Sequence, residues 1–245
     1  FSSCRSLTSI VIPEGVTSIG DETFSGCSSL TSIAIPKGVT SIGKNAFWGC
    51  DKLASVVIPE EVTSIGERAF YGCTSLTNIV IPKNVTSIDS YTFSGCSGLI
   101  SVVIPDGVTS IEKDAFSWCH SLTSIAIPEG VTSIGEDAFC CCCSLTSITI
   151  PEGVTSIGEN AFSSCSRLYE IVNNSSIPLT LGDSANGMIA YYAKVIIDKD
   201  GNKTFKDESG NFEYVDTVDG FRFEKRKERI FSAALTFAVQ NGTIN

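Results

Sequence analysis

Leu7-Thr-Ser-Ile-Val-Ile-Pro-Glu-Gly-Val-Thr-Ser-Ile-Gly-Asp-Glu-Thr-Phe-Ser-Gly-Cys27 is the stretch that decides the fold, because it returns with an offset of 23 residues. Its most regular members are Phe, Leu, Pro and Cys, and the phenylalanines are Phe1, Phe24, Phe47, Phe70, Phe93, Phe116, Phe139 and Phe162. Self-similarity with a period of about 20 to 50 residues is typical of solenoids, in which each repeat forms one coil. The sequence therefore predicts a stack of 23-residue coils.

Each coil begins with a short alternating segment. Ile10 and Ile12 alternate with Ser9 and Val11, as in a strand with one buried face. Pro13 ends the segment because proline has no N–H for a β-ladder. We expect these strands to stack in parallel on one side of the solenoid, with isoleucine inside and a smooth, uncharged face of serine and valine outside.

The second half of the coil has a different spacing. Val16 and Ile19 are three residues apart, which predicts a short extended or turn-like segment rather than an alternating strand. Thr17 and Ser18 should face outward, where stacked hydroxyls bond to each other and to the backbone. We interpret this Thr-Ser pair as structural rather than as a binding site.

Cysteine is unusually frequent, with eleven residues, and eight occupy one repeat position: Cys4, Cys27, Cys50, Cys73, Cys96, Cys119, Cys142 and Cys165. Free cysteine packs well as a small buried side chain, and parallel side chains in a stack do not reach disulfide geometry readily. We therefore predict a ladder of buried free thiols.

Four consecutive cysteines, Cys140 to Cys143, interrupt this regularity. Zinc needs four ligands placed tetrahedrally, and one tight loop does not readily supply them. Free exposed thiols are the favoured interpretation, with a local or intermolecular disulfide as the alternative.

The pattern Leu-x-x-Ile-x-Ile-Pro-x-x-Val-Thr-x-Ile-Gly-x-x-Ala-Phe-x-x-Cys resembles the BspA-like, Treponema-type leucine-rich repeat over residues 1–172. The resemblance implies a right-handed leucine-rich-repeat solenoid with a parallel sheet on one face, in a bacterial or protist surface protein. Several relatives are implicated in adhesion to host matrix proteins such as fibronectin and fibrinogen. The family supplies no catalytic residues.

The chain changes character after Leu168. We predict a solenoid of seven full coils and a partial eighth over residues 1–179, and a small β-hairpin-rich C-terminal capping region over 180–245. Hairpins are expected around Gly201 and between Phe212 and Glu224, and residues 229–240 are ambiguous, with strand preferred over helix.

The stretch Asp198-x-Asp200-x-Asn202 has the carboxylate spacing of a calcium loop. An EF-hand also needs Gly at its sixth position and Glu at its twelfth, where this chain has Lys203 and Ser209. A plain hairpin turn is therefore the favoured interpretation.

Charge and composition exclude several classes of protein. A net charge of −10 without a basic stripe argues against nucleic acid. No apolar run approaches the ~18 to 20 residues of a membrane span. Because Phe1 falls in mid-repeat, we expect a signal and further sequence before it.

Candidate site residues are few. We predict no catalytic, cofactor-binding or metal-binding residues, and the single histidine, His120, is best explained as a variable loop residue. The loop after each Phe varies more than the rest, and exposed aromatic side chains are good interface anchors. The candidate protein-binding residues are Trp48, Tyr71, Trp118 and His120. Alternatively, these rings pack over the loop edge, or the Ser/Val sheet face binds instead.

The resulting functional hypothesis is a non-enzymatic extracellular protein-binding or adhesion module, on the cell surface or secreted, without cofactors. Its ligand would be a host or matrix glycoprotein. The alternative is a structural spacer that projects another domain from the surface, because near-identical coils fit that role too.

Overall fold

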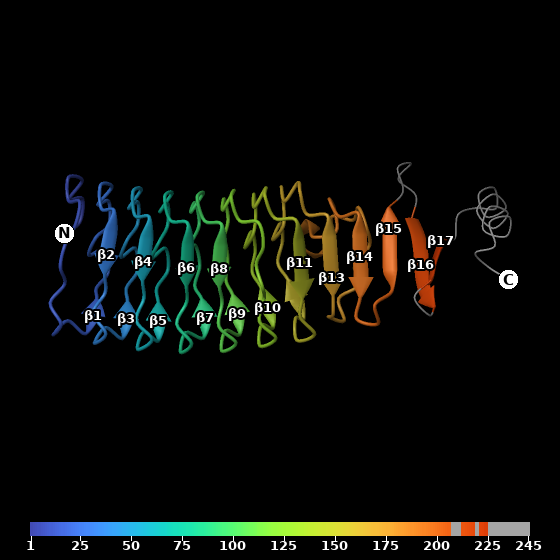
Figure 1. Cartoon of the computed structure of the whole chain (residues 1–245), viewed down its shortest axis with the longest axis horizontal. Coiled ribbons are helices and arrows are strands. Elements are labelled where there is room, and N and C mark those ends of the chain that lie inside the picture. The colour runs from blue at the N-terminus through green and yellow to red at the C-terminus, as the bar shows by residue number, and fades with distance from the viewer. Residues whose placement is uncertain (207–211, 219–220, 225–245) are drawn as a thin grey trace.

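The computed structural model describes residues 1–206, 212–218 and 221–224. Its coils stack along one axis from the N-terminus toward the C-terminal strands (Figure 1). Equivalent residues of neighbouring coils are paired in parallel with an offset of 23, as Ser32 pairs with Ser55 and Ser133 with Ser156. The predicted leucine-rich-repeat solenoid of 23-residue coils with a parallel sheet is therefore confirmed.

The first series of strands forms the predicted sheet face. Its members are β2 (Ser32–Ala34), β4 (Ser55–Val57), β6 (Asn78–Val80), β8 (Ser101–Val103), β11 (Ser147–Ile150) and β13 (Glu170–Asn173). Their apolar side chains alternate between the core and the surface, so that Val56 is buried while Val57 is exposed. The first coil joins this face through a single bridge between Val11 and Ala34.

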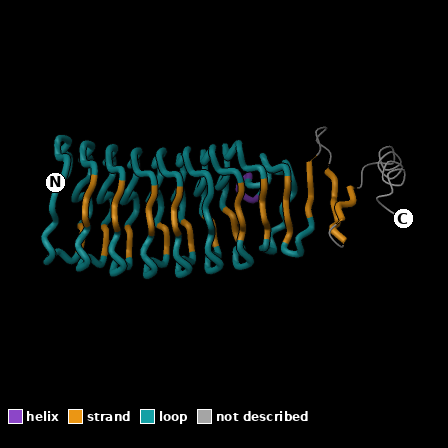
Figure 2. Tube along the Cα trace, viewed as in Figure 1, coloured by secondary structure: helices purple, strands orange, loops and turns teal. Residues whose placement is uncertain are grey.

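A second series of short strands lies in the other half of the coil (Figure 2). Its members are β1 (Ser18–Ile19), β3 (Ser41–Ile42), β5 (Ser64–Ile65), β7 (Ser87–Ile88), β9 (Ser110–Ile111), β10 (Ser133–Ile134) and β12 (Ser156–Ile157). The segments expected to be merely extended or turn-like are thus paired in parallel ladders. The Thr-Ser positions have the expected structural role, since Thr40 Oγ1 donates to the Thr17 carbonyl at 3.3 Å.

Rings stacked along the axis fill the centre of the core. Consecutive phenylalanines from Phe1 to Phe162 lie with centroids 5.2 to 5.6 Å apart and nearly parallel planes. The backbone of the same loops is paired as well, because Phe47 N donates to the Ala69 carbonyl at 2.7 Å. Each coil is therefore bonded to the next around most of its circumference.

The cysteine ladder packs beside these rings as free thiols. From Cys27 onward, each ladder thiol donates to the carbonyl of the Phe 26 residues earlier, as from Cys73 to Phe47 at 3.2 Å. Cys4, in the first coil, is exposed, so the predicted burial does not extend to it. Burial raises the pKa of Cys50 and of Cys96 to about 12, against an ordinary value of 9.0.

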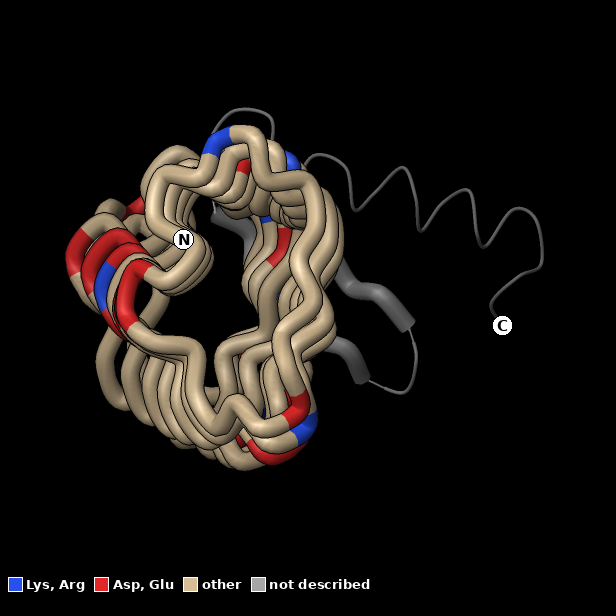
Figure 3. The backbone as a smooth tube through the Cα atoms, turned by 90° about the vertical axis from the view of Figure 1, so that its left-hand side faces the viewer, with Lys and Arg blue, Asp and Glu red and all other residues tan. Residues whose placement is uncertain are grey.

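The loops around each Phe depend on left-handed backbone. The residue two places before Phe has φ between 53° and 60° in seven coils, although it is Glu22 in one coil and Tyr91 in another. The residue two places after Phe is also left-handed, and in four coils it is glycine. Figure 3, which looks along the stack, shows the charged residues gathered mainly where the coils turn.

Beyond the repeats the sheet continues and then reverses direction. Strand β14 (Val195–Asp198) pairs in parallel with β13, and β15 (Lys203–Lys206), β16 (Phe212–Val218) and β17 (Phe221–Glu224) follow as antiparallel neighbours. Both predicted hairpins are thus present. The ambiguous residues 229–240 lie outside the described part of the chain. The division at residue 179 stays a prediction.

A segment of the tail occupies the place of a further coil against the last repeat. The 3-10 helix η1 (Asn186–Met188) presents the Gly187 carbonyl to Phe162 N at 2.7 Å, where the earlier coils present that of an alanine or, once, of Thr92. Nearby, Asn173 replaces a core isoleucine, and its amide donates to the Ile177 carbonyl at 2.8 Å while its oxygen accepts from Ser175 Oγ at 2.7 Å. These bonds satisfy the polar groups that close the core at this end.

Gly187→Ala is expected to lower the free energy of unfolding by about 2–4 kcal/mol, because strain and overpacking combine. Gly187 has φ +68°, and an added Cβ would lie 2.6 Å from the Gly158 carbonyl oxygen. Gly201→Ala is the matched control, with φ +82° but nothing within 4 Å. Urea unfolding of both variants checks this prediction, and equal losses would contradict the close fit at Gly187.

Candidate functional site

Two of the candidate aromatic residues lie against each other. Trp48 and Tyr71 follow Phe47 and Phe70 directly, so the coil register places them in one column. Their rings stack with centroids 6.2 Å apart and planes 10° apart, and Trp48 remains 44% exposed. The parallel stacking therefore leaves an aromatic surface at the loop edge.

Small residues flank this aromatic pair in the same column. Ser25 precedes Trp48 by one coil and Ser94 follows Tyr71 by one coil. Ser94 is buried, and its Oγ lies 2.8 Å from Ser117 Oγ in the next coil. The pair thus projects between coils that have only hydroxyls at this position.

Trp118 belongs to a different column, one residue later in its coil. It occupies the left-handed position at φ 61° where Gly26, Gly49, Gly72 and Gly95 stand in other coils. Its side chain is 54% exposed and meets the ring of His120 at 5.6 Å with planes 66° apart. A bulky side chain at positive φ costs roughly 1 kcal/mol or more, and such strain is concentrated at functional positions.

The four candidate residues therefore form two pairs. Tyr71 and Trp118 are separated by two coil steps, about 10 Å at the usual strand spacing. The pairs lie in the same loop series but have no aromatic contact with each other. Their role in binding stays a prediction.

Charged residues brace the neighbouring turns. Lys44 Nζ lies 2.6 Å from Glu67, Lys113 Nζ lies 2.8 Å from Glu136, and Arg68 stacks over the Tyr91 ring at 4.3 Å. Exposed pairs of this kind add little stability individually. Desolvation, followed by the nearby Asp114 and Glu136, raises the pKa of the Asp137 carboxyl. The contacts connect adjacent coils along this edge.

The Cys140–Cys143 loop contains partly buried thiols rather than the exposed thiols that were expected, and no disulfide joins them. Cys140 Sγ lies 3.6 Å from Cys141 Sγ, and Cys143 Sγ donates to the Cys141 carbonyl at 3.3 Å. Desolvation, together with the bond to Cys141, raises the pKa of Cys140 to about 12. Within the described ranges, no group of three or more His, Cys, Asp or Glu residues is placed to hold a metal ion.

Both carboxylate oxygens of Asp198 accept hydrogen bonds within the turn. One carboxylate oxygen accepts from the backbone N–H of Asp200 and of Asn202, both at 2.9 Å, and the other accepts from the Asn202 amide at 2.9 Å. These bonds lower the pKa of Asp198, with the Asn202 side chain as the main cause. The interpretation as a hairpin turn is confirmed.

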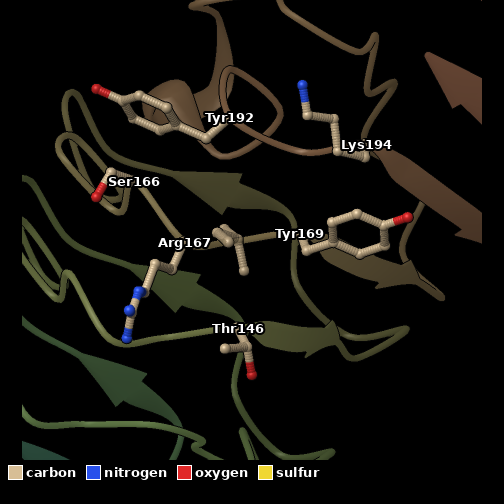
Figure 4. Close-up of a pocket in the computed structure, with 7 residues that line it drawn as sticks. Thr146, Ser166, Arg167, Tyr169, Tyr192 and Lys194 are labelled. Atoms are coloured by element: carbon tan, nitrogen blue, oxygen red, sulfur yellow. The ribbon is translucent and has the colours of Figure 1, made fainter. Parts of the chain in front are cut away.

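Sequence reasoning missed a depression of about 320 Å³ where the repeats meet the tail. Figure 4 shows its lining, which comprises Thr146, Ser166, Arg167, Leu168, Tyr169, Tyr192 and Lys194. Glu170 pairs with Val195, an offset of 25 residues instead of 23, and this change of register was not visible in the periodicity. The available signal was the replacement of small polar repeat residues by Arg167 and Tyr169.

The stacked coils, the parallel ladders and the apolar columns define a leucine-rich-repeat solenoid. The family model described as BspA type leucine-rich repeat region (6 copies) matches residues 1–107 and 87–185. The chain belongs to this BspA-type leucine-rich repeat family.

Solved bacterial structures share the fold. A leucine-rich repeat protein from Bacteroides ovatus is 33% identical, with a TM-score of 0.62 over 71% of this chain and 51% of that one. A leucine rich cell surface protein from Faecalibacterium prausnitzii is 37% identical, with a TM-score of 0.64 over 84% of this chain and 53% of that one. The leucine-rich repeat protein of T. pallidum is 35% identical, with a TM-score of 0.63 over 66% of this chain and 78% of that one.

The chain spans about half the length of the first two of these proteins. Comparison with curated proteins gives no match. In the part of the chain that the structure describes, no helix has the length and apolar character to cross a bilayer.

Proposed function

We propose that this chain is a non-enzymatic, extracellular protein-binding module, displayed on a cell surface or secreted, whose ligand is a host or matrix glycoprotein. The observation that carries the proposal is the pair of exposed aromatic contacts, Trp48 with Tyr71 and Trp118 with His120, on a scaffold of otherwise small loop residues. Family membership supports the proposal, because leucine-rich repeats commonly bind proteins.

The rings of Trp48, Tyr71, Trp118 and His120, here called the aromatic edge, have the properties of an interface anchor. Tryptophan and tyrosine supply large contact areas with few rotatable bonds, so little entropy is lost when a partner covers them. The stacking of Tyr71 against Trp48 and the fixed backbone of the coils orient the rings before binding. A structural spacer has no need for a tryptophan at a left-handed position such as Trp118.

Biolayer interferometry against a panel of matrix glycoproteins at physiological salt tests the proposal. Saturable binding is expected, and Trp48→Ala/Tyr71→Ala and Trp118→Ala should each weaken it at least tenfold, the range of a 1.4 kcal/mol anchor. Val57→Ser, on the exposed sheet face, is the matched control and should change the Kd by less than twofold.

Two outcomes would redirect the interpretation. Binding that is lost in Val57→Ser but retained in the aromatic variants would place the site on the sheet face instead. Absence of saturable binding to every panel member would contradict the recognition module and favour the spacer.

A further inference from the structure

The depression at the end of the repeats is built from three rigidly paired segments. Thr146, Tyr169 and Lys194 occupy equivalent ladder positions directly before β11, β13 and β14. Tyr169 N donates to the Thr146 carbonyl at 2.9 Å, and Lys194 N donates to the Tyr169 carbonyl at 2.8 Å. The backbone that carries these side chains is therefore held in place without a ligand.

The charge of the depression is opposite to that of the molecule. Its lining includes Arg167 and Lys194 and no carboxylate, although the chain has a net charge of −10. Neither cation forms an ion pair with any residue that the structure describes, whereas Lys44 and Lys113 do. Two unpaired cations in one hollow favour an anionic occupant.

The remaining lining adds rings and hydroxyls. Tyr169 is 56% exposed, and Tyr192 is held edge-on against Tyr191 with centroids 4.9 Å apart. In Figure 4, Tyr169 and Tyr192 lie on different sides of the depression, and the charged end groups of Arg167 and Lys194 point away from each other. The apolar C–H face of a sugar packs on such rings, while Thr146 and Ser166 offer hydroxyls to sugar hydroxyls.

We propose that this depression binds an acidic carbohydrate chain, with carboxylate or sulfate groups on successive sugars paired to Arg167 and Lys194. Cations on opposite sides suit an oligosaccharide with repeated charges better than a single small anion. Of the strands that directly follow the lining residues, β11 has the uncharged outward residues Ser147 and Thr149, whereas β13 has Glu170 at the position that pairs with Ser147. This site is separate from the aromatic edge and would serve in addition to it.

The test uses the whole chain and four soluble probes of matched length: a sulfated heparin hexasaccharide, an oligogalacturonate, neutral maltohexaose and a polyglutamate peptide. Saturable binding is expected for at least one acidic glycan, and maltohexaose should bind at least tenfold more weakly. The sulfated and uronate probes distinguish the two sources of negative charge.

Single substitutions test whether the glycan binds in the depression. Arg167→Gln, Lys194→Gln and Tyr169→Ala should each weaken the acidic glycan at least tenfold, because all three side chains lie on the surface and can be changed without disturbing the core. Lys52→Gln is the matched control, since Lys52 holds the position of Arg167 five coils earlier. Trp48→Ala should leave glycan binding unchanged, so this proposal can fail independently of the protein-binding one.

Three results would overturn the proposal. The first is no saturable binding of either acidic glycan. The second is a loss in Lys52→Gln equal to that in Arg167→Gln, which would indicate diffuse attraction of charge. The third is polyglutamate binding as tightly as the glycans, which would assign the depression to acidic peptides instead.

Discussion

Raising the pH from 9 to 10 is expected to remove about 1 kcal/mol of stability for each buried ladder thiol, so that six thiols lose about 6 kcal/mol. The six are Cys50, Cys73, Cys96, Cys119, Cys142 and Cys165, in all of which desolvation raises the pKa. A loss of this size equals much of the stability of an ordinary domain.

The sign follows from the proton balance of the two states. In the unfolded chain these thiols lose their protons near the ordinary pKa of 9.0, whereas folded Cys50, Cys96 and Cys165 keep theirs up to about 12. The folded state therefore binds more protons between these values, and the free energy of unfolding falls as the pH rises. Below pH 9 the contribution of the thiols is fully present.

Guanidinium unfolding under reducing conditions at pH 8, 9 and 10 measures the effect. Lysine and tyrosine titrate in the same range, so Cys73→Ala/Cys96→Ala is needed to isolate the thiols, and it should reduce the drop by about 2 kcal/mol. Both sites are fully buried, so their loss does not alter the surface. A drop between pH 9 and 10 that is identical in the variant would contradict the assignment.

Phe93→Ala is expected to cost about 3–5 kcal/mol, the range for truncating a fully buried aromatic residue. The Phe93 ring is completely buried between Phe70 at 5.6 Å and Phe116 at 5.3 Å, so its removal leaves a gap in the middle of the stack. Phe1→Ala is the control, because Phe1 is 64% exposed and stacks on one ring only. Its cost should stay below about 1 kcal/mol.

Removal of the Phe93 ring should also weaken the coupling between the coils on its two sides. In a solenoid each coil contacts only its neighbours, so one weakened interface can separate the unfolding of its two sides. The chain has two tryptophans, Trp48 and Trp118, and they lie on opposite sides of Phe93. With Trp48→Phe, only Trp118 reports unfolding by its fluorescence, and with Trp118→Phe, only Trp48 does. The urea transitions of these two single-tryptophan variants should coincide when Phe93 is present and diverge after Phe93→Ala. A cost below 1 kcal/mol would contradict the importance of this ring.

The core of the coil could be predicted because it depends on spacing alone. Phe93 and Cys96 return in register in every coil, and a stack brings such columns together whatever the local geometry. The second ladder was not foreseen, since Val16 and Ile19 are three residues apart and do not alternate. The left-handed positions were hidden as well, because residues such as Tyr91 occupy them instead of glycine.

The same distinction applies to the candidate sites: the repeat predicts one of them and not the other. The stacking of Trp48 on Tyr71 follows from one column in adjacent coils, and it is therefore readable from the repeat. The depression at Arg167 and Lys194 depends on two extra residues before β14, whose path is set by tertiary packing. A periodic pattern carries no information about a segment that leaves the period.

The uniform offset between coils has a consequence for how genes of this kind can change. Ser18 pairs with Ser41 as Ser133 pairs with Ser156, so junctions far apart in the repeats have the same register. Unequal recombination that inserts or deletes one repeat unit therefore keeps the backbone register between the coils that it joins. The length of the solenoid can thus change in steps of one coil within a lineage. The segment around Gly187 that covers the last coil has to be kept in each case.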